Sequence, residues 1–70
     1  MKDKILQLAK KLKPFIDGLD YYELTEIVNN TFNSEKTLQE NIDVFINKIG
    51  VYIKGLDSEE IGEYCMQAMK

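Results

Sequence analysis

The chain has 70 residues, of which 44% are hydrophobic and 30% are charged, a composition typical of a folded globular protein. Its single cysteine excludes an internal disulfide, and the absence of histidine excludes His-based catalytic triads and the usual zinc sites. This length predicts one domain over residues 1–70. No residue pattern predicts a cofactor, a metal site or an enzymatic activity.

The charge of the chain narrows the partners that it is expected to bind. Twelve acidic residues against nine lysines give a net charge of −3, and there is no arginine, the preferred reader of guanine and phosphate. Both features argue against nucleic-acid binding. We find no signal-peptide pattern and no apolar run near the ~18 residues of a membrane span, so we expect a cytoplasmic protein without a membrane span.

Apolar residues recur at helical spacing in four segments, and no segment alternates with the period of a strand. The pattern predicts an all-α fold, a compact bundle of four short helices built as two antiparallel helical hairpins. The predicted helices cover residues 3–17, 20–32, 35–54 and 58–69. Their apolar stripes are, in chain order, Ile5, Leu8, Ala9, Leu12 and Ile16; Leu24, Ile27, Val28 and Phe32; Leu38, Ile42, Phe45, Ile46, Ile49 and Ile53; and Ile61, Tyr64, Cys65, Ala68 and Met69.

Turn and capping residues separate the predicted helices. Pro14 lacks an amide donor and is expected to kink or end the first helix. The sequence Gly18-Leu19-Asp20-x-x-Glu23 predicts a left-handed turn followed by a capped helix start. Ser34 or Thr37 is expected to cap the third helix. Before the fourth helix, Gly55-Leu56-Asp57-x-x-Glu60 repeats the first turn and cap.

The two turn motifs belong to a longer internal repeat. When the chain is shifted by 37 residues, eight positions are identical, and most other core positions are apolar in both copies. The sequence therefore predicts a duplicated helical hairpin, and the alternative is that two unrelated corners use the same capping chemistry. One difference between the copies is a second apolar line in the third helix, where Val44 and Val51 stand opposite Gln7 and Pro14.

That second apolar line is a candidate protein-binding surface. A helix that is apolar on two sides is either central in its bundle or part of an interface, and both alternatives stay open here. Tyr22 falls off the apolar stripe of its helix, so its ring is expected to be exposed, and Tyr52 borders the stripe of the third helix. We predict an interface that contains Tyr22, Val44, Val51 and Tyr52.

Other candidate chemical groups have simpler structural explanations. The acidic clusters that start at Asp20 and Asp57 fit helix capping, and a di-metal site in a bundle normally needs histidine, which is absent. Cys65 lies on the apolar stripe of the last helix, which predicts a buried structural thiol. Residues 24–38 match part of a helix-turn-helix, but Phe32 occupies the position of the turn glycine and the following helix is net negative.

The motif Gly55-Leu56-Asp57-Ser58 resembles the phosphopantetheine site of acyl carrier proteins, which are also small, acidic and built of four helices. The resemblance implies a covalent prosthetic group on Ser58. It covers only these few residues. Glu59 stands where that family has an apolar residue, and the long loop before the modified serine is missing, so helix capping explains the same residues without a prosthetic group.

The sequence predicts a small non-enzymatic protein-binding module that acts through a helical surface. In size and character it is comparable to phage-encoded inhibitors, immunity proteins and small regulators, and its content of lysine, isoleucine and asparagine is typical of low-GC bacteria and their phages. The expected partner is another protein, or a second copy in a homo-oligomer. The alternatives are a structural or self-assembling subunit, a carrier modified at Ser58 and a helix-turn-helix DNA-binding protein.

Overall fold

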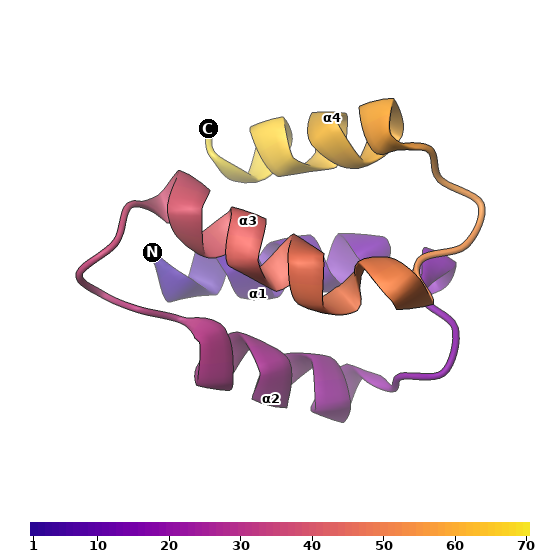
Figure 1. The fold of residues 1–70 in the computed structure, drawn as a ribbon, viewed down its shortest axis with the longest axis horizontal. Helices are drawn as coiled ribbons and strands as arrows, with labels where there is room; N and C mark the ends of the chain where they lie inside the picture. The colour runs from indigo at the N-terminus through magenta and orange to yellow at the C-terminus, as the bar shows by residue number, and fades with distance from the viewer.

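A computed structural model describes all 70 residues as four α-helices without a strand, which confirms the predicted all-α fold (Figure 1). The predicted first and third helices are too long, because each gives way to a short 3-10 turn before its predicted end. In chain order the elements are α1 (Lys2–Leu12), the 3-10 turn η1 (Lys13–Phe15), α2 (Tyr21–Thr31), α3 (Leu38–Ile49), the 3-10 turn η2 (Gly50–Tyr52) and α4 (Ser58–Ala68).

The corners of the two hairpins have the same backbone path. Pro14 lies in η1 directly after α1, as expected, but η2 makes the same turn with Val51 at the equivalent position. Proline is therefore compatible with this corner without being required for it. Both corners continue through a glycine in the left-handed region, Gly18 at φ 92° and Gly55 at φ 83°. Residues with a side chain are strained at such angles, so the turn requires glycine at these two positions.

Capping boxes begin α2, α3 and α4. In each, an N-cap side chain accepts a hydrogen bond from an amide three residues later, and the glutamate at that later position accepts one from the N-cap amide. The Asp20 carboxylate accepts from the Glu23 amide at 2.8 Å, and Asp57 makes the equivalent contact before α4. Thr37, and not Ser34, caps α3. The predicted helix starts are thus confirmed to within a few residues.

The two hairpins are joined at their corners by a symmetric backbone bridge. Ile16 and Ile53 pair as an isolated antiparallel bridge, and each is the equivalent of the other under the 37-residue shift. The same shift converts the bounds of α2 into those of α4. The corners of the two hairpins are thus related by an approximate two-fold axis, as a duplicated hairpin predicts, whereas α3 and α4 lack the close packing that joins α1 to α2. The hydrogen bonds beside the bridge are Asp17 N–H to Tyr52 O, 2.8 Å, and Lys54 N–H to Phe15 O, 2.7 Å.

The hydrophobic core is built by the first hairpin and α3. Close packing joins α1 to α2, α1 to α4, and α2 to α3. Helix α1 therefore packs closely against two other helices, whereas α3 packs closely against α2 alone. The prediction that the apolar stripe of α4 is part of the core is wrong in degree. No residue of α4 is fully buried, and the stripe residues that pack against the core, Tyr64, Cys65, Ala68 and Met69, are half-buried. The ten buried apolar residues are Ile5, Leu8, Ala9, Leu12, Ile16, Leu24, Val28, Ile42, Phe45 and Ile49.

The side chain of Asn41 is polar and buried in this core. It forms hydrogen bonds with the linker between the hairpins, residues 32–37. Its Nδ2 donates to the carbonyl oxygens of Asn33 and Thr37, each at 2.9 Å, and its Oδ1 accepts from the Asn33 amide at 2.7 Å. The amide is therefore satisfied on both sides, as a buried polar group requires. Nothing in the apolar pattern distinguishes Asn41 from an exposed position.

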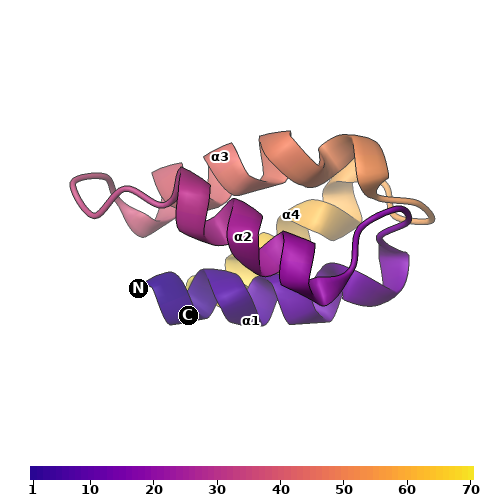
Figure 2. The ribbon, with the colours of Figure 1, turned by 90° about the horizontal axis from the view of Figure 1, so that it is seen from below.

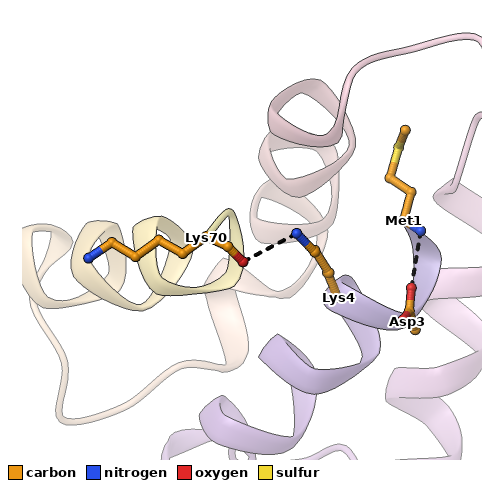
Figure 3. A network of polar contacts seen from close by, with 4 residues as sticks. All are labelled: Met1, Asp3, Lys4 and Lys70. Carbon is orange, nitrogen blue, oxygen red and sulfur yellow. Dashed lines mark hydrogen bonds and ion pairs between the residues drawn. The ribbon is translucent and has the colours of Figure 1, made fainter.

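The two ends of the chain lie at the end of the bundle opposite the corners (Figures 1 and 2). The Lys4 ammonium donates to the carbonyl oxygen of Lys70 at 3.2 Å, which links the start of α1 to the end of α4 (Figure 3). Beside it, the Met1 amino group pairs with Asp3 at 3.0 Å, and this hydrogen bond and charge lower the pKa of the Asp3 carboxyl. The lysines of α1 form no ion pair with acidic residues of α2 or α4.

Candidate functional site

A groove between α3 and α4 is the largest hollow of the molecule, with a volume of about 630 Å³. The two helices that flank it, α3 and α4, are not among the closely packed pairs. Pockets that bind ligands typically have volumes of a few hundred to about 1,000 Å³. Six of its eleven lining residues are hydrophobic, and they are Ile42, Ile46, Ile61, Cys65, Met66 and Met69.

The first hairpin is closed at the positions where the second is open. Leu24 and Val28 of α2 are fully buried in the core. Their equivalents under the 37-residue shift, Ile61 and Cys65 of α4, are half-buried and line the groove. The chain therefore places at an accessible surface the same pattern of apolar residues that forms the core in its first half.

Three differences between the two hairpins reduce the apolar contact that α4 can make with α3. Leu6 packs against the core in the first hairpin, whereas the second has Asp43 there, an exposed carboxylate in the groove lining. Closing the groove would strip water from this charge, which is costly without a partner. The other two replacements remove side-chain volume. They put Ser58 in the place of Tyr21 and Gly62 in the place of Thr25.

Gly62 lies in the interior of α4 and lines the groove. A Cβ atom at this position would meet no heavy atom within 4 Å, so no neighbour within the chain requires glycine there. Glycine in a helix interior costs about 1 kcal/mol relative to alanine. The fold thus accepts a less stable helix at the point where α4 faces the open groove.

The electrostatics of the groove are acidic. Burial raises the pKa of the Cys65 thiol, and the negative charge of Asp43 on the opposite helix raises it further. The thiol is therefore protonated at neutral pH, and the two walls are close enough to influence each other. No lysine lines the groove, while α4 carries Glu59, Glu60 and Glu63 and no basic residue. None of these carboxylates is in an ion pair.

The residues predicted as an interface lie outside this groove. Tyr22 is 71% exposed and Val51 is 77% exposed, so the expectation of an exposed Tyr22 ring is confirmed. Val44 is half-buried, and Tyr52 packs against the core with its ring near Gly18. The start of α2 and η2 lie at the same end of the bundle (Figure 1). Binding at these four residues stays a prediction.

The sequence pattern predicts that the groove residues are buried in the core, and it does not distinguish a groove residue from a core residue. Ile61 and Cys65 belong to the expected stripe of the last helix, and the predicted burial of Cys65 is wrong in degree because its side chain is half-buried. Two signals of an open hairpin are nevertheless present in the aligned repeat. They are Asp43 opposite Leu6 and the mid-helix Gly62 opposite Thr25.

Other candidate groups occupy ordinary structural positions. Asp20 and Asp57 act as helix caps, and no three acidic or cysteine side chains gather closely enough to hold a metal ion. Ser58 is the first residue of α4, is exposed and lies in the groove lining. The segment between α2 and α3 spans residues 32–37, which is longer than the tight turn of a helix-turn-helix.

Comparison with known proteins identifies no relative: the sequence matches no protein-family model, and neither the curated proteins nor the solved structures contain a significant match. None of the four helices combines the length and the apolar character that crossing a bilayer requires.

Proposed function

We propose that this chain is a small non-enzymatic protein-binding module that receives a partner in the groove between α3 and α4. One observation carries this proposal. Ile61 and Cys65 line an open groove although their equivalents, Leu24 and Val28, are fully buried in the first hairpin. Contiguous apolar surface of this kind commonly marks a site of protein association, because covering it removes apolar area from water.

Side-chain chemistry supports a role in binding rather than catalysis. A cysteine nucleophile needs a lowered pKa or an adjacent base, whereas burial and Asp43 raise the pKa of Cys65. The chain has no histidine to act as that base. The groove offers apolar contact and one carboxylate, which suits recognition of another protein surface.

The test is a groove-dependent capture experiment. The tagged chain and two variants, Ile61→Asp and Val51→Lys, are incubated with a lysate of the organism that encodes the chain, and captured proteins are identified by mass spectrometry. Ile61→Asp places a charge in the groove, whereas Val51→Lys alters the exposed predicted interface. Circular dichroism confirms that both variants stay helical.

We expect one stoichiometric partner that binds the native chain and Val51→Lys and is lost from Ile61→Asp. A partner that is lost only from Val51→Lys would move the interface to the outer side of α3 and η2. Recovery of the bait alone, together with a concentration-dependent increase in mass by light scattering, would favour the self-assembling subunit. Either of these results contradicts the groove proposal.

A carrier function through Ser58 is the second candidate, and one observation favours it. Ser58 is exposed and lies beside apolar residues of the groove, where a prosthetic group attached to its hydroxyl could pack. This alternative predicts an increase in the intact mass of the chain expressed in its native host, which Ser58→Ala abolishes. An unmodified intact mass contradicts it.

A further inference from the structure

From the chemistry of the groove, and resting on the proposed function, we infer that the occupant is an amphipathic helix with a basic polar face, supplied by a partner protein. Two antiparallel helices form the walls, and a third helix is the regular element that can lie along such a groove with its apolar side inward. The first hairpin shows that residues of this pattern pack against helices, since Leu24 and Val28 of α2 are buried against α1 and α3.

The apolar lining suits a ligand that presents a stripe of side chains. Ile46 of α3 and Ile61 of α4 line the groove from opposite sides, and the buried Ile42 connects it to the core. Met66 is 60% exposed and Met69 is half-buried, so flexible thioether side chains form part of the α4 wall. Methionine adapts to apolar ligands of different shape, which favours recognition of a helix face over a single deep pocket.

Charge complementarity identifies the polar face of that helix as basic. Asp43 is the only charged residue in the lining, and Glu59 lies one helical turn before the lining residue Gly62 on the same side of α4; neither carboxylate is in an ion pair. A helix lying in the groove brings its flanks close to these two carboxylates. Lysine or arginine on the flanks gains favourable interactions and accelerates encounter, whereas acidic flanks are repelled.

Gly62 supplies the space that such a helix needs. It lies in the lining, and the free chain has nothing within 4 Å of the position that a Cβ would occupy. Small residues at a helix–helix contact let the two backbones approach closely. The glycine that destabilises α4 in the free protein thus marks the point of closest contact with the bound helix.

The probes for the test are three synthetic peptides of about 14 residues, enough for an α-helix slightly longer than α3. The first has leucines along one helical face and lysines elsewhere, the second replaces every lysine by glutamate, and the third has the first composition in scrambled order. Calorimetry with the full chain measures affinity, and amide chemical shifts locate the contact. We expect the basic amphipathic peptide to bind at α3 and α4 at least about tenfold more tightly than the other two peptides. We expect its affinity to decrease as the salt concentration rises.

Glycine variants separate binding from folding. Gly62→Ala is expected to slow amide hydrogen exchange within α4, because alanine improves that helix. Gly62→Leu is expected to weaken the peptide affinity by about tenfold or more, because its side chain fills the groove. Gly50→Ala is the matched control. Gly50 also has a helical backbone and nothing within 4 Å of a Cβ, but it lies outside the groove, so its substitution stabilises the fold without changing affinity.

Three outcomes would overturn the inference: equal affinity for the acidic and basic peptides, peptide shifts outside α3 and α4, or unchanged affinity in Gly62→Leu. Concentration-dependent shifts of α3 and α4 without peptide would assign the groove to a second copy instead. Failure of this inference is distinguishable from failure of the proposed function. If a native partner is lost from Ile61→Asp but is not displaced by the basic peptide, the groove is still the binding site and the inference of a basic helix is wrong.

Discussion

The first hairpin of this protein is closed and the second is open, although both are built on the same backbone framework. The bounds of α2 and α4, the ends of α1 and α3, the 3-10 turns, the left-handed glycines and the capping boxes of α2 and α4 repeat at an offset of 37 residues. Burial does not repeat, since α2 contributes two fully buried residues and its equivalent α4 contributes none. Backbone turns and helix closure are therefore specified by different residues.

The difference arises where the copies exchange apolar for polar or smaller side chains. The corner residues are retained, so the chain reverses direction in the same way in both hairpins. At the facing positions, Asp43 replaces Leu6 and Gly62 replaces Thr25, which lowers the gain from bringing α4 onto α3. Two hairpins with the same corners can thus differ in closure, with α2 contributing to the core and α4 lining a groove.

The largest expected effect comes from truncating equivalent residues in the two hairpins. Leu24→Ala removes a fully buried side chain and is expected to lower the free energy of unfolding by about 2–5 kcal/mol. Ile61→Ala changes the equivalent half-buried residue and is expected to cost about 1 kcal/mol or less. Urea denaturation followed by circular dichroism measures both.

If Leu24→Ala does not fold, the smaller truncation Val28→Ala provides the same comparison, with its equivalent Cys65→Ala in the open hairpin. The closed–open distinction predicts the larger loss in the first hairpin for either pair. Equal losses in both hairpins would show that α4 is packed as firmly as α2.

The next effect concerns Asn41, a buried polar residue whose equivalent in the first hairpin is not fully buried. Asn41→Ala leaves the Asn33 amide without its acceptor, while the carbonyl groups of Asn33 and Thr37 keep the backbone amides of residues 36 and 41 as donors. The substitution is expected to cost about 1–3 kcal/mol. The equivalent residue is Lys4, for which substitution by alanine is expected to cost less than about 0.5 kcal/mol. Urea denaturation gives the costs, and faster hydrogen exchange of the Asn33 amide shows that the linker has loosened.

The sequence predicts the framework well because its signals are local. Helical spacing and the Gly-x-Asp-x-x-Glu corners depend on neighbours along the chain, and the repeat confirms them twice. Closure of a hairpin depends on contacts between helices, and Ile61 and Cys65 carry the same apolar signal whether buried or in a groove. Asn41 shows the same limit, since its burial depends on carbonyl groups of the linker that periodicity does not place.

A smaller effect concerns the two aspartate caps. They are chemically identical, but Asp20 caps a helix with buried residues and Asp57 caps a helix without any. Asp20→Ala and Asp57→Ala each remove a cap worth about 1 kcal/mol. Because α2 carries core residues, the loss of its cap should lower the global stability. The loss at α4 should appear mainly as local opening, measured as faster amide hydrogen exchange within α4 at a nearly unchanged urea midpoint. Identical exchange patterns in the two variants would contradict an independently opening α4.

The smallest expected effect is the pH dependence that the open hairpin owes to Cys65, whose equivalent Val28 does not titrate. Burial and the charge of Asp43 raise the thiol pKa in the folded chain, so the unfolded chain loses this proton first as pH increases. The contribution to stability is complete below the unfolded thiol pKa of about 8.5 and declines as pH rises from there through the raised folded value.

Cys65→Val gives the second hairpin the residue of the first and should abolish this decline. Urea midpoints of both proteins from neutral pH to about pH 10 measure the difference, in which the shared tyrosine and lysine titrations cancel. A native chain that loses no more stability than Cys65→Val over this range would mean that the thiol is as hydrated in the groove as in the unfolded chain, and that the groove is wider in solution than its lining indicates.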